Sequence, residues 1–268
     1  PIVFAIIGDF GLDGPRETAV AALVKSWSPE FIMTTGDNNY GTATSGLASF
    51  DLNVGKHYGD FIAPYSGTHW DASAPAAKNR FWPTMGNKDW DIGPGFPYGD
   101  FFTLPGNERY YDVTVGPVHF TIVGSDAREP DGNVATGVQA AWAEATIKAS
   151  PSPFQFVFYH HPAYASGTVE TKMRWAFKSW GADAYFTGHI HNYERLVVDG
   201  QQYFVNGQGG NSTSNFGTVA AGSAVRYNAQ DGAQRVVVSS TKATFQYYNA
   251  LGALIDEVAI DPSGATIP

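Results

Sequence analysis

The sequence contains no cysteine among its 268 residues. This absence excludes disulfide bonds, thiolate catalysis and cysteine-ligated zinc, so any metal must be held by oxygen and imidazole ligands. Basic residues are also scarce: 16 lysines and arginines stand against 25 aspartates and glutamates, for a net charge of −9. Proteins that bind nucleic acid usually carry a basic footprint, so we expect no nucleic-acid partner. No apolar run approaches the roughly 18–20 residues of a membrane span, so we expect no membrane partner.

Hydrophobic residues make up 43% of the chain, which is enough for a folded core. Over the first two thirds, the apolar pattern predicts strands at Ile2–Ile7, Glu30–Thr35, Phe81–Met85, Phe154–Tyr159 and Ala182–Phe186. It predicts helices at Pro15–Trp27, Gly137–Ala149 and Val169–Trp180, and a hairpin formed by Arg109–Val115 and Val118–Val123. The last third is rich in strands, predicted at Arg195–Asp199, Gln201–Val205, Arg235–Ser240, Ala243–Asn249 and Ala253–Ile260. This order predicts a layered α/β fold with more than one sheet, in a single domain over residues 1–268.

Polar side chains that can bind metals follow five of the predicted strands. They are Asp9, Asp37 with Tyr40, Asn87, His160 with His161, and His189 with His191. Each alone is compatible with a turn residue or a satisfied polar group, but four of the seven histidines fall in two of these segments. Ligands bind at the carboxyl ends of strands in open α/β sheets. Carboxylates suit hard cations, imidazoles suit Zn, Fe, Mn or Co, and one carboxylate can bridge two ions.

The motifs that carry these residues resemble, in order, those of the calcineurin-like metallophosphoesterase superfamily. They are Gly8-Asp9-Phe10-Gly11, Gly36-Asp37-Asn38-Asn39-Tyr40, Gly86-Asn87, Val157-Phe158-Tyr159-His160 and Gly188-His189-Ile190-His191. Tyr40, three residues after Asp37, and the segment Asn192-Tyr193-Glu194-Arg195 resemble the purple acid phosphatase branch. The resemblance implies a four-layer α/β/β/α sandwich of two mixed β-sheets flanked by helices. It also implies a dinuclear metal-dependent phosphomonoesterase, in which hydroxide generated at the ions attacks phosphorus in line.

The resemblance further implies a role for each of seven residues: the first metal is held by Asp9, Tyr40 and His191, the second by Asn87, His160 and His189, and both by Asp37. In that branch the first metal is Fe(III) and the second is a divalent ion, here Zn, Fe or Mn. Tyr40 suits Fe(III), because a highly charged ion can depress the phenol pKa of about 10 until the phenolate forms. The neutral carbonyl of Asn87 leaves the second ion more Lewis acidic than a carboxylate would.

Two positions depart from the family pattern. The family follows its ligand asparagine with histidine, where this chain has Lys88, and places a second histidine nine residues beyond His160, where this chain has Val169. Lys88 could replace the missing imidazole as a cationic clamp on phosphate, and His161 is a further candidate for a catalytic group beside the metals. Alternatively, the enzyme prefers diesters or esters with good leaving groups, or the protein binds metal and phosphate with little turnover.

The remaining expectations concern partners and location. We expect a small phosphorylated substrate, and by resemblance to secreted relatives we expect a secreted or periplasmic protein. Pro1 is not an initiator methionine, which fits removal of a signal peptide or a truncation. The glycine-rich segment Asn206–Gly210 could bring the backbone close to the metal site, and the Asn211-Ser212-Thr213 triplet matches a glycosylation sequon.

Overall fold

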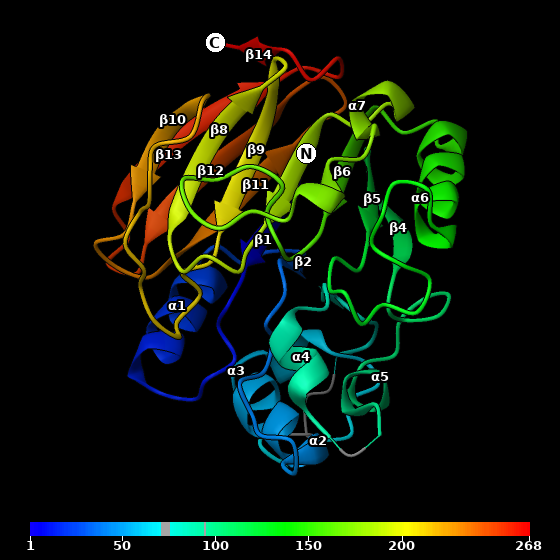
Figure 1. Ribbon diagram of the computed structural model, residues 1–268. Helices are drawn as coiled ribbons and strands as arrows, with labels where there is room; N and C mark the ends of the chain where they lie inside the picture. The colour runs from blue at the N-terminus through cyan, green and yellow to red at the C-terminus, as the bar shows by residue number, and fades with distance from the viewer. Residues whose placement is uncertain (71–75, 94) are drawn as a thin grey trace.

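Two mixed β-sheets form the centre of the fold (Figure 1). The structure is a computed structural model that describes residues 1–70, 76–93 and 95–268, and within these ranges each sheet has seven strands. The first sheet has the order β14 (Thr266–Ile267), β13 (Leu254–Ile260), β12 (Ala243–Asn249), β11 (Gly232–Val238), β1 (Ile2–Ile7), β2 (Phe31–Thr34) and β3 (Phe81–Trp82). The second has the order β10 (Ser223–Tyr227), β8 (Tyr193–Val198), β9 (Gln201–Asn206), β7 (Ala184–Thr187), β6 (Phe154–Phe158), β5 (Val118–Ile122) and β4 (Tyr111–Val115).

Parallel pairing is confined to one part of each sheet. Strands β1, β2 and β3 are parallel neighbours in the first sheet, and β5, β6, β7 and β9 are parallel neighbours in the second. The strands from β11 to β14 pair antiparallel, as do β4 with β5 and β8 with β9. Each parallel group therefore presents the carboxyl ends of its strands along one edge of its sheet.

The strand β6 shows why the chain forms layers. Its side chains alternate between two faces, as the period of an extended strand requires. Phe156 belongs to the core between the sheets and contacts Phe245 of β12, with ring centroids 5.5 Å apart. Val157 belongs to a separate buried cluster with Ala143 and Ile147. Both faces of the strand are buried, so its sequence is a continuous apolar run.

Helices cover the outer faces of the two sheets. The helix α1 (Pro15–Ser26) packs against β11 of the first sheet, while α6 (Val138–Ala149) and α7 (Phe177–Trp180) contact each other over the second sheet. This arrangement confirms the predicted α/β/β/α sandwich. Within the described ranges, none of the helices has the combination of length and apolarity that crossing a membrane requires.

Two of the predicted elements were wrong in extent. The predicted helix Val169–Trp180 is only a 3₁₀ turn, Thr171–Met173, followed by α7. Trp175 and Phe177 are both buried and their rings contact each other at 5.3 Å, a contact between residues two apart that a continuous helix does not allow. The predicted strand Phe81–Met85 ends at Trp82, because Pro83 has no N–H to donate to a neighbouring strand.

Short helical elements that the sequence did not predict lie at the lower end of the molecule in Figure 1. They are α2 (Gly46–Phe50), the π-helical turn Asp51–Gly55, α3 (Lys56–Tyr58), the 3₁₀ turn Gly59–Phe61, α4 (Asn87–Asp91) and α5 (Pro97–Phe101). Aromatic rings hold them together: Phe50 stacks on Phe101 at 5.6 Å, and Phe102 stacks on Phe81 at 5.7 Å. These short helices lie next to the carboxyl ends of β1 and β2 in Figure 1.

Candidate metal centre

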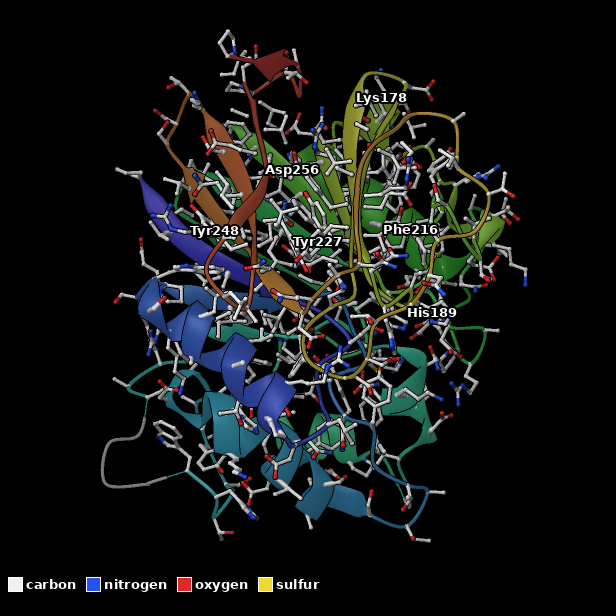
Figure 2. All side chains as sticks on the ribbon, turned by 90° about the vertical axis from the view of Figure 1, so that its left-hand side faces the viewer. Lys178, His189, Phe216, Tyr227, Tyr248 and Asp256 are labelled. Atoms are coloured by element: carbon white, nitrogen blue, oxygen red, sulfur yellow. The ribbon has the colours of Figure 1, made fainter. Side chains whose placement is uncertain are left out.

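The seven side chains predicted to bind metals meet where the two sheets and the short helices adjoin. Asp9 follows β1, Asp37 and Tyr40 follow β2, and Asn87 opens α4 beyond β3. From the second sheet, His160 follows β6, and His189 and His191 follow β7. Figure 2 shows His189 at the end of the second sheet that faces the short helices. The parallel strands of both sheets therefore end close together, and these residues lie at their carboxyl ends.

Three of these residues form a first trio, Asp9, Tyr40 and His191. The Tyr40 hydroxyl donates to Asp9 Oδ1 over 3.2 Å and lies 3.0 Å from His191 Nε2. His191 Nε2 also lies 3.4 Å from Asp9 Oδ1. The three potential ligand atoms are thus mutual neighbours.

Asn87, His160 and His189 form a second trio. Asn87 Oδ1 lies 3.1 Å from His160 Nε2 and 3.0 Å from His189 Nδ1. Asp37 Oδ1 lies 3.3 Å from His160 Nε2. Ligand atoms of Asp9, Asp37 and His160 all fall within 4.8 Å of one another, so Asp37 lies between the two trios.

The donor atoms fit metal ions. Two ligands that share an ion at about 2.1 Å, in octahedral or tetrahedral arrangement, lie about 3.0–3.4 Å apart. The spacings within each trio fall in this range. The set combines carboxylate, phenol and amide oxygens with imidazole nitrogens, and Asp9 and Asp37 are buried. Such a set suits transition-metal ions with hard or intermediate character.

The backbone is strained at three of these residues. Asp9, Asp37 and His189 adopt positive φ angles of 54°, 51° and 68°, a region that few residues other than glycine occupy. Strain of this kind persists only where the surroundings enforce it, and it concentrates at functional sites. The packing nearby is tight: a Cβ on Gly188 would lie 2.4 Å from Asp9 Oδ2, and one on Gly86 would lie 2.2 Å from Asp37 Oδ1.

The charged side chains of the site shift one another's pKa values. Burial raises the pKa of Asp37, but the charge and hydrogen bond of His160 outweigh it and hold that pKa at about 2. Burial likewise lowers the pKa of His160, and the Asp37 carboxylate outweighs it and raises that pKa to about 10. Burial and the charges of Asp9 and Asp37 raise the pKa of Tyr40. The site therefore has an electronegative interior that favours a cation.

Hydrogen bonds at Nδ1 fix the orientation of two of the imidazole rings. His160 donates from Nδ1 to the Thr35 carbonyl over 2.8 Å, which turns Nε2 toward Asn87. His191 Nδ1 is hydrogen-bonded to Ser212 Oγ. Such contacts set the tautomer and orientation of metal-binding histidines. The sequence did not assign Ser212 to the site. The glycine-rich segment before it, which could bring the backbone close, does approach the site: a Cβ on Gly207 would lie 3.1 Å from Asp9 Oδ2.

Of the two candidate catalytic residues, the Lys88 side chain points to Asp91, whereas the His161 ring lies beside His160. Lys88 donates its backbone N–H to Asp37 Oδ1 over 2.8 Å, whereas its ammonium lies 3.5 Å from Asp91 Oδ2 and its side chain is 42% exposed. His161 has its ring 4.9 Å from that of His160, and its Nδ1 lies 2.9 Å from Ser125 Oγ.

Val169 contributes no polar group to the site. It packs against an apolar cluster that contains Ala165, Leu196 and Val205. The position of the usual second histidine is thus occupied by a side chain that serves packing.

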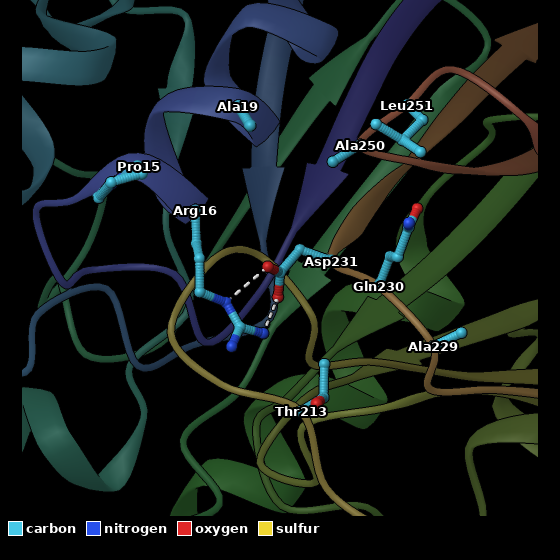
Figure 3. Close-up of a pocket in the computed structure, with 9 residues that line it drawn as sticks. All are labelled: Pro15, Arg16, Ala19, Thr213, Ala229, Gln230, Asp231, Ala250 and Leu251. Atoms are coloured by element: carbon cyan, nitrogen blue, oxygen red, sulfur yellow. Dashed lines mark hydrogen bonds and ion pairs between the residues drawn. The ribbon is translucent and has the colours of Figure 1, made fainter.

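A cavity of about 430 Å³ lies beside α1 and is lined by none of the seven predicted ligands (Figure 3). Arg16 and Asp231 form a bidentate ion pair across it, with both N–O distances at 2.7 Å. Thr213 lines the cavity and is the neighbour of Ser212, so the loop that contacts His191 also borders the cavity.

Comparison with known proteins identifies relatives over most of the chain. The family model described as calcineurin-like phosphoesterase matches residues 2–193. Purple acid phosphatase 15 of Arabidopsis thaliana is 26% identical over 243 residues, covering 77% of this chain and 44% of that protein. Purple acid phosphatase 23 of the same plant is 28% identical over 255 residues, covering 79% of this chain and 53% of that protein. The chain therefore spans about half the length of these relatives.

A solved structure shares the fold. The purple acid phosphatase PPD1 from yellow lupin (Lupinus luteus) seeds superimposes with a TM-score of 0.74 at 16% identity. The match covers 97% of this chain and 53% of the lupin chain.

Proposed function

Because the chain belongs to the calcineurin-like phosphoesterase family, we propose that it hydrolyses phosphate esters with two metal ions. The observation that carries the proposal is the arrangement of the seven side chains into two trios with Asp37 between them. The substrate is a small phosphorylated molecule, and the purple acid phosphatase relatives favour a phosphomonoester.

The first trio would hold Fe(III) and the second trio a divalent Zn, Fe or Mn ion, with Asp37 shared by both. The phenol of Tyr40 supports this assignment, because a phenolate is a hard ligand that Fe(III) prefers. When bound, the ions would polarise the phosphoryl group, offset its developing charge and lower the pKa of water.

The chain's own residues would orient these groups. The Lys88 amide holds one oxygen of Asp37, which restricts rotation of that carboxylate. Thr35 accepts the Nδ1 hydrogen of His160, so Nε2 is the nitrogen that would give up its proton and bind a metal. These contacts pre-organise the ligands, so little rearrangement is needed when a metal or substrate binds.

His161 would supply a hydrogen-bond donor for the leaving group. Ser125 Oγ accepts a hydrogen bond from the backbone N–H of His161. The same Ser125 hydroxyl is buried and donates its own hydrogen to His161 Nδ1. Burial and the charges of His160 and His189 lower the pKa of His161 to about 3, so the ring is neutral. A neutral ring that accepts at Nδ1 carries its hydrogen at Nε2, from which it can donate a hydrogen bond to a leaving-group oxygen.

The rival function is metal or phosphate binding with little turnover. It is favoured by the ion pair between Lys88 and Asp91, which draws the ammonium to another residue of the same short helix, and by the apolar surroundings of Val169. A phosphodiesterase is the third candidate, since diesters with good leaving groups need less proton donation.

A substrate panel separates these functions. Monoesters and diesters would be assayed from acid to alkaline pH after loading with Fe, Zn or Mn. We expect turnover that Asp37→Asn lowers at least about 10³-fold, more than the loss of one charge-stabilising donor usually costs. Asp183→Asn is the control, because Asp183 is buried at the opposite, amino end of β7. No turnover with a filled site would favour the rival, and faster diester hydrolysis would favour the phosphodiesterase.

The Fe(III) assignment has its own test. A phenolate bound to Fe(III) gives a visible charge-transfer band. We expect this band in iron-loaded protein and its loss in Tyr40→Phe. A band that survives in the variant would contradict the role of Tyr40. We further propose that the protein is secreted or periplasmic, which fractionation of the native cells would test.

A further inference from the structure

We propose that Arg128 is a positioning residue that holds the turn carrying Asn87 and thereby sets the affinity of the second trio for its ion. The proposal rests on the proposed function, because that function makes Asn87 a ligand. Arg128 lies in the loop between β5 and α6, on the second sheet, whereas Asn87 follows β3 of the first. The contact therefore crosses between the two halves of the molecule.

Arg128 contacts both ends of α4. Its Nη2 donates to the main-chain oxygen of Asn87 over 2.9 Å, and its Nη1 donates to Asp91 Oδ1 over 2.8 Å. Asn87 is the first residue of this five-residue helix and Asp91 is the last. One planar guanidinium thus spans the whole element.

Asp126 fixes the guanidinium in turn. Arg128 donates from Nε to Asp126 Oδ1 over 2.8 Å and from Nη2 to Oδ2 over 3.0 Å. This is the bidentate geometry in which arginine and carboxylate restrain each other most firmly. The Asp126 side chain is 9% exposed, so the anchor is embedded in the protein while Arg128 reaches outward.

The helix α4 needs such support. A helix of five residues is far too short to be stable through its own hydrogen bonds. Its amino end is held by Asp89, which accepts the N–H groups of Gly86 and Asn38 over 2.8 and 3.1 Å. Arg128 supplies a further restraint, and its bond to the Asn87 carbonyl acts on the residue that bears the ligand.

The charges around Arg128 indicate a positioning role, since they leave it little attraction for a phosphate. Its positive charge is matched by Asp126 and Asp91, and the Lys88 ammonium shares Asp91 from 3.5 Å. The two cations and two carboxylates sum to zero. An arginine that clamps phosphate would instead keep an uncompensated charge directed at the site.

Zinc titration of the metal-free protein tests the proposal. Wild type is expected to bind two equivalents of Zn²⁺ in competition with a chelator. In Arg128→Ala we expect the dissociation constant of one equivalent to rise about 10–100-fold, the usual effect of removing a group that orients a ligand. Histidine NMR signals identify the affected ion: those of His160 and His189 should respond only at higher zinc, while that of His191 responds as in wild type.

The control is Arg16→Ala. Arg16 has the same side-chain exposure of 44% and a bidentate ion pair with Asp231, so its loss matches the lost charge and one lost bidentate ion pair. We expect both zinc affinities to stay unchanged in this variant. If Arg128→Ala does not fold, Asp126→Asn keeps the arginine, removes its anchor and should weaken the same equivalent.

The outcomes are distinguishable. Two equivalents bound by Arg128→Ala with wild-type affinities would overturn the role of Arg128 and leave the proposed function intact. Equal weakening of both equivalents would overturn it too, because it would show a general loss of structure. A wild-type protein that binds no zinc or any other metal would overturn the proposed function and the inference together.

Discussion

Replacing Ser212 with alanine should weaken metal binding by the first trio alone. Ser212 Oγ holds His191 Nδ1, while Nε2 of the same ring faces Tyr40 and Asp9. Without the hydroxyl, the ring can rotate and its tautomer is no longer fixed. The His191 side chain is 18% exposed, so water can replace the lost partner and the fold should survive.

The magnitude follows from the type of contact. Groups that orient a metal-binding histidine are worth about 10–100-fold in affinity, which corresponds to about 1.4–2.8 kcal/mol at 1.4 kcal/mol per factor of ten. One neutral hydrogen bond contributes only about 0.5–1.5 kcal/mol to folding. In Ser212→Ala, the affinity for one ion should therefore fall more than the stability of the metal-free protein does.

Chelator-competition titration with Zn²⁺, combined with urea unfolding of the metal-free protein, measures both quantities. Thr213→Ala is the matched control, because it removes a hydroxyl from the adjacent, exposed residue that lines the cavity in Figure 3. The reasoning is refuted if Ser212→Ala binds both ions as tightly as Thr213→Ala, or if it weakens both ions equally.

Three further substitutions test other parts of the structure by urea unfolding. Gly207→Ala would place a Cβ 2.2 Å from the Ile190 carbonyl and should cost about 1–3 kcal/mol; unchanged stability would contradict this close packing. Arg195→Ala would leave the carboxylate of Asp256, which is 6% exposed, without its ion-pair partner and should cost about 3 kcal/mol. Burial raises the pKa of Asp183 from 3.8 to about 7. The unfolded chain therefore ionises first, and wild type should lose stability as the pH rises from about 4 to 7. Asp183→Asn should remove the share of this pH dependence that Asp183 contributes and gain as much as ~4 kcal/mol above pH 7, at 1.36 kcal/mol per pKa unit; parallel curves for both proteins would disprove it.

The strands that carry the site were predictable because their patterns are local. The predicted strand Ile2–Ile7 matches β1, and the predicted strand Ala243–Asn249 matches β12. The short helices between residues 46 and 61 were not predictable, since three- to five-residue turns have no apolar period to detect. Their stability comes from aromatic contacts with distant residues, such as Phe50 with Phe101.

The residues that meet at the site were predictable from their types and order, whereas the groups that support them were not. Asp9 and His191 come from motifs, but the seryl hydroxyl on His191 has no signature beyond its proximity in space. Arg128 lies 41 residues from Asn87 along the chain, and no sequence pattern in either segment predicts the contact. Such support depends on the packing of one sheet against the other, which sequence patterns do not specify.

The metal content of the protein tests the central claim most directly. Purified protein would be stripped of metal, reconstituted with Fe, Zn or Mn, freed of excess ions and analysed for metal by mass spectrometry. The arrangement of two trios around Asp37 predicts two equivalents in wild type and no more than one in Asp37→Asn. Fewer than one equivalent in wild type with every metal would contradict the claim.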